Sequence, residues 1–321
     1  QYLMKFFSIF VIMGILNFLP LLGLTLAKSE GSMLTEILQV TSGKKAAVDA
    51  SAIVHYAMQS LVGEAAEELA YALHSDGVFF VPEETKTVIR NRVINFERLV
   101  SGKLDCVPIM ILDGQPFPGK AAEEQDRKER RALSFSRGVE LRAVVEEAER
   151  RYNYLKGSAQ GDSVKKAKAD LAKAKKDMTS SFKASFYRHP GITDYFMFVL
   201  RERGIKYFVA LYEADSQIAY LILTGACHLA LVEDSDLAAY GASSLFGGIK
   251  FHKVRNNPNK FEVGYLDCSH SLFKEHTFKG RTYDMRGWTI QDVQALGNIM
   301  GSDYCTIEDV GLVKGFAIVE T

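Results

Sequence analysis

The feature that most constrains the fold is a series of short apolar runs that each end in carboxylates. Stretches with helical spacing separate these runs along the chain. They are "KKAAVDAS", which reaches Asp49; "CVPIMILDG", which reaches Asp113; "IKYFVAL", which Glu213 and Asp215 follow; and "CHLALVED", with Asp234 and Asp236. Short strands that alternate with helices predict an α/β fold with a mostly parallel central sheet and helices on both faces.

The acids at the strand ends predict a metal site. Parallel strands bring their carboxyl ends to one edge of a sheet, where ligands of open α/β sheets bind. Carboxylates that crowd together repel one another and resist burial unless a cation lies among them, and hard oxygen ligands suit Mg²⁺ or Mn²⁺. A single Asp after a strand is more often a loop residue or a helix N-cap. Repetition at every strand end favours the metal site over that simpler interpretation.

Two apolar-periodic stretches predict helices before the charged region: one over Ala52–His74 and one over residues 85–100. Between Lys120 and Arg188 the chain becomes charged, helix-favouring and poor in apolar residues, with a turn expected at residues 158–163. This pattern is typical of a solvated helical hairpin, and it equally fits a basic arch that contacts phosphates.

Composition limits the remaining function classes. The net charge is zero and the pI about 7.2, so the chain lacks the global basic signature of a nucleic-acid binder. The four cysteines form no C-x-x-C pair, which favours free thiols in a reducing compartment. Cys268, His270 and His276 have a spacing that fits no common zinc template.

Residues 1–27 are strongly apolar, and Lys5 is their only charge. The stretch is long enough to span a bilayer or to form a signal-peptide core. Asn17 and Pro20 weaken the interpretation as a spanning helix. A core helix that begins at Met13, after an apolar extension over residues 1–12 of uncertain origin, is the alternative.

Four blocks of sequence together resemble the structure-specific 5′-nuclease family, which includes flap endonuclease, the XPG repair nuclease and exonuclease 1. The blocks are "MGILNFLPLL", "ILDGQPFPGKAAEEQDRKERR", "YEADSQIAYLILTGACHLALVEDSDLAAYG" and "GSDYCTIEDVGLVKG". The resemblance is greater to the exonuclease 1 branch. It implies a PIN-like fold with one catalytic domain: an N-terminal nuclease segment (13–133), a charged helical arch (134–189), and an internal nuclease segment (190–321) with a helix–two-turn–helix.

The same resemblance implies which residues carry the chemistry. The expected metal ligands are Asp49, Asp113, Glu213, Asp215, Asp234, Asp236 and Asp303. Lys120 and Arg127 match the catalytic basic residues that contact the scissile phosphate. The expected DNA contacts are His55, Arg130, Arg131, Gly311 and Lys314. Asp309 departs from the family's Gly-x-Gly turn, and it should weaken the backbone contact and any K⁺ bound there.

The implied function is 5′ to 3′ exonuclease or 5′-flap endonuclease activity on DNA in repair or replication. Two Mg²⁺ ions, for which Mn²⁺ can substitute, would serve an in-line displacement. The substrate would be DNA with a free 5′ end, nick, gap or flap, and no small-molecule cofactor is expected. We expect a nuclear monomer.

Other interpretations stay open from the sequence alone. One is a catalytically degenerate scaffold that binds branched DNA, and another is a D-x-D metal-dependent phosphatase. A membrane or secreted protein, based on residues 1–27, is the last.

Overall fold

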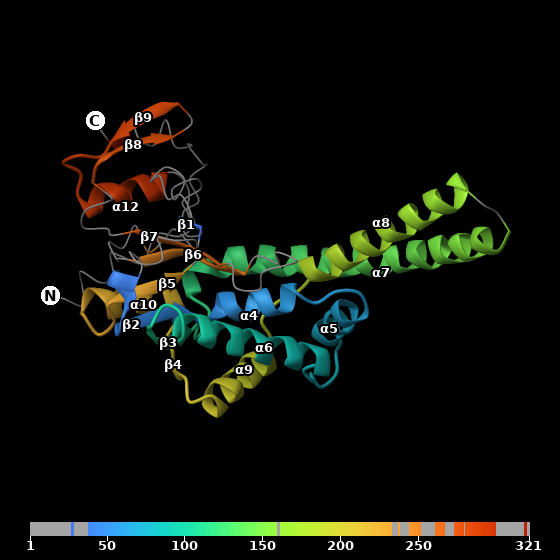
Figure 1. The fold of residues 1–321 in the computed structure, drawn as a ribbon, viewed down its shortest axis with the longest axis horizontal. Helices are drawn as coiled ribbons and strands as arrows, with labels where there is room; N and C mark the ends of the chain where they lie inside the picture. Colours follow the sequence, from blue (N-terminus) through green and yellow to red (C-terminus); the bar gives the residue numbers. More distant parts are fainter. Residues whose placement is uncertain are drawn as a thin grey trace. The chain divides into compact units, whose positions relative to one another are not determined.

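The computed structural model describes residues 27–28, 38–158, 161–232, 237, 244–251, 261–266, 273–278, 280–299 and 318–319. The chain divides into two compact units, each assembled from separate parts of the sequence (Figure 1). Unit 1 contains residues 1–52, 94–121 and 203–321, and unit 2 contains residues 53–93 and 122–202.

Unit 1 is built on a seven-stranded sheet in the order β1-β7-β6-β5-β2-β3-β4. The strands are β1 (Ala27–Lys28), β2 (Lys45–Asp49), β3 (Val107–Leu112), β4 (Lys206–Val209), β5 (Leu229–Val232), β6 (Ser244–Phe251) and β7 (Phe261–Leu266). Every pair from β4 through β3, β2 and β5 to β6 is parallel, whereas β7 runs antiparallel to β6 and to β1. The four strands predicted from the sequence are therefore confirmed as neighbours in a parallel arrangement, which makes the fold class α/β.

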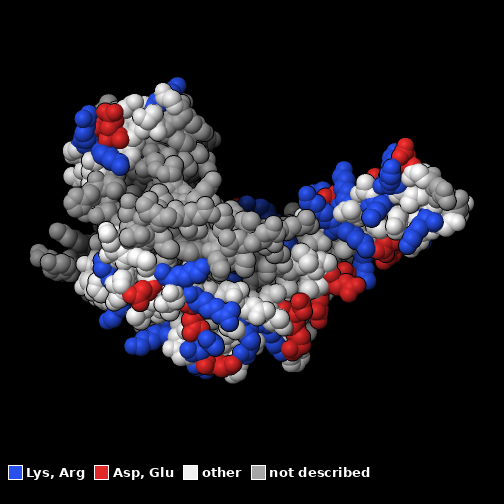
Figure 2. All heavy atoms as spheres, viewed as in Figure 1, with Lys and Arg blue, Asp and Glu red and all other residues white. Residues whose placement is uncertain are grey.

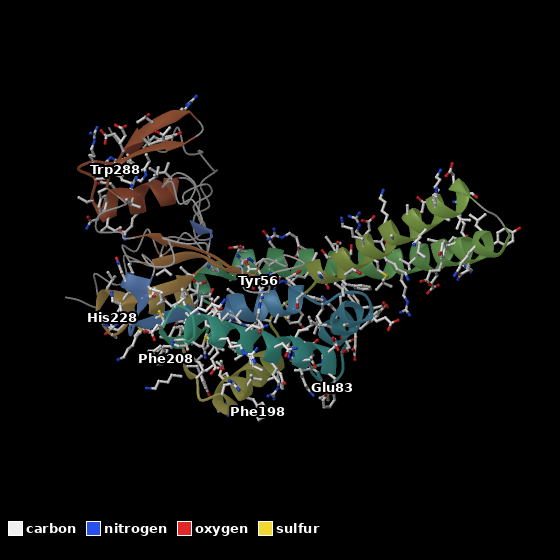
Figure 3. All side chains as sticks on the ribbon, in the orientation of Figure 1. Tyr56, Glu83, Phe198, Phe208, His228 and Trp288 are labelled. Carbon is white, nitrogen blue, oxygen red and sulfur yellow. The ribbon has the colours of Figure 1, made fainter. Side chains whose placement is uncertain are left out.

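The central strands are apolar because both faces of the sheet are covered there. All of β5 is buried, and so are the three middle residues of β2. At the edge, β4 leaves half of Phe208 exposed (50%) (Figure 3). This gradient is expected of a parallel sheet, whose inner strands form near-continuous hydrophobic runs.

Helix α10 (Ala214–Leu223) covers part of this sheet through contacts with β2, β3 and β5. Its buried Ile218 and Ala219 join a core cluster with Ala47, Ile111 and Ala230 of the strands. The same cluster includes side chains from α12 (Ile290–Ile299) and from β9 (Arg281–Asp284), which pairs with β8 (Glu275–Phe278). The strands β6 and β7 and the β8–β9 hairpin have no counterpart among the elements predicted from the sequence.

Unit 2 is helical, and one sequence prediction about it is wrong. The single helix expected over Ala52–His74 is two helices, α4 (Ala50–Gln59) and α5 (Glu64–His74). Gly63, the N-cap residue of α5, lies between them with a φ of 56°, a region that glycine enters without steric penalty and that interrupts a right-handed helix. The apolar period continues across the break, which is why the pattern suggested one helix. The second predicted helix is confirmed as α6 (Glu83–Val100).

The charged region forms a long helical hairpin of α7 (Ala121–Ser158) and α8 (Asp162–Ala184), joined at the predicted turn. Lys175 of α8 pairs with Glu149 of α7 at 2.6 Å, so the two helices lie side by side. Basic and acidic side chains are interspersed along their surfaces (Figure 2). After α8 the chain continues into α9 (Pro190–Glu202), which starts with Pro at its first position, where a missing N–H is harmless.

An aromatic cluster anchors this hairpin to α5. The ring of His74 stacks on Phe135 at 4.5 Å, and Phe182 of α8 is fully buried. Tyr187 donates its hydroxyl hydrogen bond to the Leu73 carbonyl at 2.6 Å. The hairpin is therefore exposed along most of its length and packed at its base.

Some predictions fall on residues that the structure does not describe. They are the helix–two-turn–helix over residues 301–317 and the apolar residues 1–26. Within the ranges described above, no helix combines the length and apolar character that a bilayer span requires.

Candidate functional site

Asp49 is the last residue of β2 and directly precedes α4. Its Oδ1 accepts a hydrogen bond from the backbone N–H of Ser51 at 2.8 Å, which satisfies one of the unpaired donors at the helix N-terminus. Asp49 is half-buried. The simpler interpretation from the sequence, that of a helix N-cap, therefore holds for this residue.

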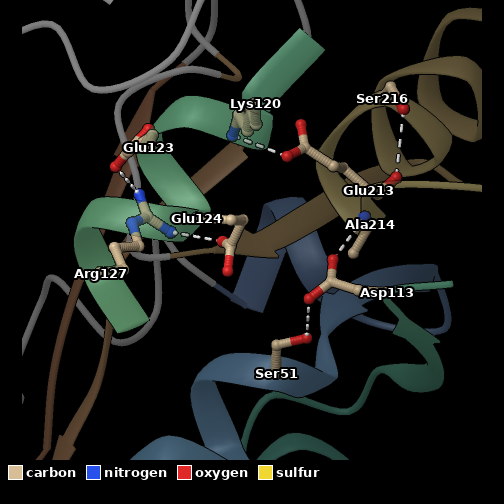
Figure 4. Close-up of polar contacts among 9 residues, drawn as sticks. All are labelled: Ser51, Asp113, Lys120, Glu123, Glu124, Arg127, Glu213, Ala214 and Ser216. Atoms are coloured by element: carbon tan, nitrogen blue, oxygen red, sulfur yellow. Dashed lines mark hydrogen bonds and ion pairs between the residues drawn. The ribbon is translucent and has the colours of Figure 1, made fainter. Parts of the chain in front are cut away.

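Asp113 follows β3 and contacts two other segments of unit 1 (Figure 4). Its Oδ2 accepts a hydrogen bond from the Ser51 hydroxyl at 2.6 Å, and its Oδ1 accepts one from the backbone N–H of Ala214 at 2.7 Å. Ala214 is the first residue of α10, so Asp113 caps a helix more than a hundred residues away in the sequence. One carboxylate thus links the ends of β3, α4 and α10. Because a carboxylate can accept about four hydrogen bonds, these contacts leave it able to serve as a ligand.

Gly114 makes this arrangement possible because the chain crosses itself closely there. Its N–H donates to the Tyr212 carbonyl at 2.6 Å, and the N–H of Gln115 donates to the Leu211 carbonyl at 3.1 Å. A Cβ added at Gly114 would lie 1.9 Å from the carbonyl oxygen of Ala210. The crossing therefore requires glycine, and it fixes Asp113 beside the segment that leads into α10.

An open cavity of about 610 Å³ lies at this crossing. Its lining includes Asp113, Gln115, Phe208 and Gln217. Asp113 is thus the acid of this edge that borders the cavity.

Glu213 and Asp215 lie at the start of α10. Glu213 is the N-cap residue and Asp215 lies in the first turn, where negative charge is favourable to the helix dipole. Both residues are half-buried. The carboxyl edge of the sheet therefore carries Asp49, Asp113, Glu213 and Asp215 from three neighbouring parallel strands, as the sequence predicted.

Lys120 brings a positive charge to these acids. It closes a short 3₁₀ turn, η1 (Pro118–Lys120), between the crossing at Gly114 and helix α7. Its Nζ lies 2.6 Å from Oε1 of Glu213, and only 5% of the lysine side chain is exposed, compared with 24% for Glu213 (Figure 4). A nearly buried ammonium requires such a partner, since an unpaired charge is costly to bury.

The other predicted basic residues belong to the part of α7 in unit 2. Arg127 forms ion pairs with Glu123 and Glu124, which precede it by four and three residues on the same helix surface. Arg130 donates to the backbone carbonyl of Asp126 at 3.4 Å. Partial desolvation lowers the pKa of Arg131, and a guanidinium keeps its charge in proteins.

His55 lies on α4 with its side chain exposed. Desolvation of the ring and, secondarily, the positive charge of Arg131 lower the pKa of His55 from its ordinary value of 6.5. The imidazole is therefore neutral at pH 7, which suits a ring that stacks on a nucleobase better than one that pairs with phosphate.

The structure thus describes part of the predicted site. It joins Asp49 to Asp113 through Ser51, and Glu213 to Lys120. The remaining predicted ligands and contacts, Asp234, Asp236, Asp303, Gly311 and Lys314, lie outside the described residues. Among the residues that are described, no group of three or more His, Cys, Asp or Glu side chains lies close enough to hold a metal ion.

The donor set fits a divalent cation in its chemistry. All of the predicted ligands at this edge are carboxylates, which Mg²⁺ and Mn²⁺ prefer, and neither His nor Cys is among them. The ion pair of Lys120 with Glu213 already places one positive charge at this edge. Cys106 and Cys227, the cysteines that the structure describes, are buried free thiols, so neither belongs to a metal cluster.

Sequence reasoning missed Ser51 and Gly114. Ser51 directly follows the Asp49-Ala50 pair, and Gly114 directly follows Asp113, so both had a signal in the sequence. An Asp-x-Ser step at a strand–helix junction suggests a capping turn, and a Gly after a strand end suggests a close backbone approach.

Comparison with known proteins identifies related sequences and folds. Residues 204–283, which contain β4, α10 and β5, match the family model of the XPG I-region. Exonuclease 1 of Arabidopsis thaliana is 30% identical over 66% of this chain, which covers 23% of that protein. Flap endonuclease 1 of Theileria annulata is 24% identical over 96% of this chain, which covers 50% of the relative. The chain thus spans between about a fifth and a half of the length of such curated relatives.

The solved structures agree on the fold. The catalytic core of Rad2 in complex with a DNA substrate has a TM-score of 0.54 to this chain at 17% identity, and the match covers 96% of this chain and 69% of Rad2. A second Rad2–DNA complex gives a TM-score of 0.53. This chain therefore has the fold of the Rad2 catalytic core, and its residues 204–283 are similar to the XPG I-region.

Proposed function

We propose that this chain is a metal-dependent 5′-nuclease that hydrolyses phosphodiester bonds of DNA at a free 5′ end, nick, gap or flap. The observation that carries the proposal is the acidic edge itself. Asp49, Asp113, Glu213 and Asp215 end neighbouring parallel strands or start the following helix, and a nearly buried Lys120 accompanies them. Ligands of open α/β sheets bind at this edge. Residues 204–283, which match the XPG I-region, contribute Glu213 and Asp215 to it.

The acids would hold the metal in two groups. Asp113, Glu213, Asp215 and Asp234 would bind one divalent ion, and Asp49, Asp236 and Asp303 would serve a second. When bound, Mg²⁺ or Mn²⁺ would supply a water of lowered pKa and stabilise the charge on the attacking and leaving oxygens.

The remaining residues bind and orient DNA. Lys120 reaches the acidic edge with its ammonium and would neutralise charge that grows on the scissile phosphate. Arg127 would share that role after leaving its helical ion pairs. His55, neutral at pH 7, would stack on an unpaired base, and Arg130, Arg131, Gly311 and Lys314 would contact backbone phosphates without reading sequence. The same proposal includes a K⁺ ion bound at the turn near Asp309. It also includes action as a monomer and a nuclear role in repair or replication.

The relatives support DNA as the substrate. The Rad2 core that shares this fold was solved in complex with a DNA substrate. Exonuclease 1 and flap endonuclease 1 are named for cleavage at ends and at flaps.

The test uses a 5′-flap and a nicked duplex, each with a label at the 5′ end, incubated with Mg²⁺ or with EDTA. We expect short 5′ products that require the metal. Binding without cleavage would identify a DNA-binding scaffold, and phosphate release from small esters alone would identify a phosphatase.

Asp113→Asn is the most informative variant. The amide oxygen can still accept the hydrogen bond from Ala214 N–H, so the helix cap and the fold should remain, whereas the charge that binds metal is lost. We expect cleavage to fall at least 10²-fold with little change in thermal stability. The matched control is Asp76→Asn, which changes an exposed acid between α5 and α6. Cleavage by Asp113→Asn at the rate of the control would remove Asp113 from the metal site.

A further inference from the structure

Ser51 contacts both acids that end the central strands β2 and β3. Its backbone N–H donates to Oδ1 of Asp49 at 2.8 Å, and its hydroxyl donates to Oδ2 of Asp113 at 2.6 Å. The hydroxyl bond joins residues that are 62 positions apart in the sequence. No motif of the sequence analysis assigned a role to this serine.

The sheet register explains why a bridging residue is needed. In the parallel pair of β2 and β3, Asp49 lies opposite Ile111. Asp113 comes two positions after Ile111, so its side chain projects to the same face but lies roughly 6.6 Å further along the strand direction. Two carboxylates with this offset do not orient one another. Ser51, in the first turn of α4, spans the offset with one backbone and one side-chain donor.

The hydroxyl contact exceeds what capping of α4 requires. A helix N-cap needs an acceptor for the N–H of the first turn, and Asp49 provides it. The hydroxyl of Ser51 points instead to Asp113 after the neighbouring strand. Together with the Ala214 N–H, which bonds the other carboxylate oxygen, it fixes the rotation of this carboxylate about a soft torsion. Outer donors of this kind orient metal-binding carboxylates in many proteins, and their loss typically lowers metal affinity about 10–100-fold.

We propose that Ser51 is a positioning residue that holds the Asp49 and Asp113 carboxylates in one geometry for a divalent cation. The inference rests on the proposed function, because it assumes that these acids bind metal. It adds a residue that acts through others, since Ser51 need not touch the metal or the DNA.

The test compares Ser51→Thr with Ser51→Val in the whole chain. The two variants have the same shape, and only Thr keeps the hydroxyl, so any difference between them reports the hydrogen bond to Asp113. Ser60→Ala is the matched control, because the Ser60 hydroxyl donates at 2.7 Å to the Ala57 carbonyl at the other end of α4. Mn²⁺ binding is measured without DNA by electron paramagnetic resonance titration, and circular dichroism checks that each variant is folded.

We expect Ser51→Val to bind Mn²⁺ about 10–100-fold more weakly than the wild type, and Ser51→Thr and Ser60→Ala to stay close to it. In cleavage assays the loss in Ser51→Val should shrink as Mn²⁺ is raised, because weak metal binding rather than lost chemistry causes it. Equal Mn²⁺ affinity of the Val and Thr variants would overturn the inference and leave the nuclease proposal intact. A wild-type chain that neither binds Mn²⁺ nor cleaves DNA would overturn both.

Discussion

The close crossing at Gly114 gives a sharp prediction for Gly114→Ala. The new Cβ would lie 1.9 Å from the Ala210 carbonyl oxygen, 2.7 Å from the Leu211 carbonyl oxygen and 2.9 Å from the Leu211 carbonyl carbon. These atoms belong to the backbone, so no side-chain rotation relieves the contact. The segments on either side of the crossing must move apart.

The magnitude follows from what the movement breaks. The crossing holds two backbone hydrogen bonds, Gly114 N–H to Tyr212 and Gln115 N–H to Leu211. Each contributes about 0.5–1.5 kcal/mol, and forcing extra atoms into a packed site costs about 1–3 kcal/mol. We therefore expect the free energy of unfolding to fall by about 2–6 kcal/mol. Cleavage should fall further than stability alone explains, because Asp113 precedes the crossing and moves with it.

Urea unfolding followed by circular dichroism measures the change, with Gly157→Ala as the control. Gly157 lies in the last turn of α7, and a Cβ there has nothing within 4 Å. That variant should be neutral or slightly stabilising, since Ala is the better helix former by about 0.5–1 kcal/mol. If the free energy of unfolding of Gly114→Ala lay within about 0.5 kcal/mol of the wild-type value, the crossing could not be as close as the structure has it.

Two further predictions concern unit 2 and the thiols. Phe182→Ala should lower the free energy of unfolding by about 3–5 kcal/mol in a urea titration, because the ring is fully buried at the base of the α7–α8 hairpin. A decrease below about 1 kcal/mol would mean that the hairpin is not anchored there. Cys106 should react with a thiol reagent only after unfolding, since desolvation raises its pKa to about 11 and the residue is 2% exposed. The native chain and its Cys106→Ser variant should therefore have the same number of fast-reacting thiols. One fewer fast-reacting thiol in the variant would contradict the buried placement of Cys106.

The parts of the fold that sequence predicted best are those that local pattern determines. The strands β2, β3, β4 and β5 were found because apolar runs of their length, separated by helices, leave few alternatives. Helix α7 was found because a long charged stretch without Gly or Pro clusters favours a helix. The break between α4 and α5 was missed because the hydrophobic period continues through it. Helix α4 ends at Gln59, and Gly63, with its positive φ, directly precedes α5.

The contacts of the candidate site were harder to predict than its residues. The acids could be named because each follows a strand, but their partners depend on register and on the crossing at Gly114. The sequence distance from Ser51 to Asp113, or from Asp113 to Ala214, carries no sign of a hydrogen bond. Lys120 was predicted to face phosphate, and its ion pair with Glu213 could be known only once η1 had been placed beside α10.

The acids at this edge were first weighed as either helix caps or metal ligands, and the structure indicates that the two roles belong together. Asp49 caps α4 and Asp113 caps α10. Each carboxylate accepts a hydrogen bond from a backbone N–H at the start of a helix, and the same bond restrains the carboxylate. Such restraint helps a metal-binding carboxylate to keep its geometry while metal and DNA are exchanged. The carboxylate is already oriented in the folded chain, so its orientation need not be found again at each turnover. Asp113→Asn separates the two roles, since it keeps the cap and removes the charge. Loss of stability in that variant with cleavage kept at the wild-type rate would mean that capping alone explains why an acid stands there.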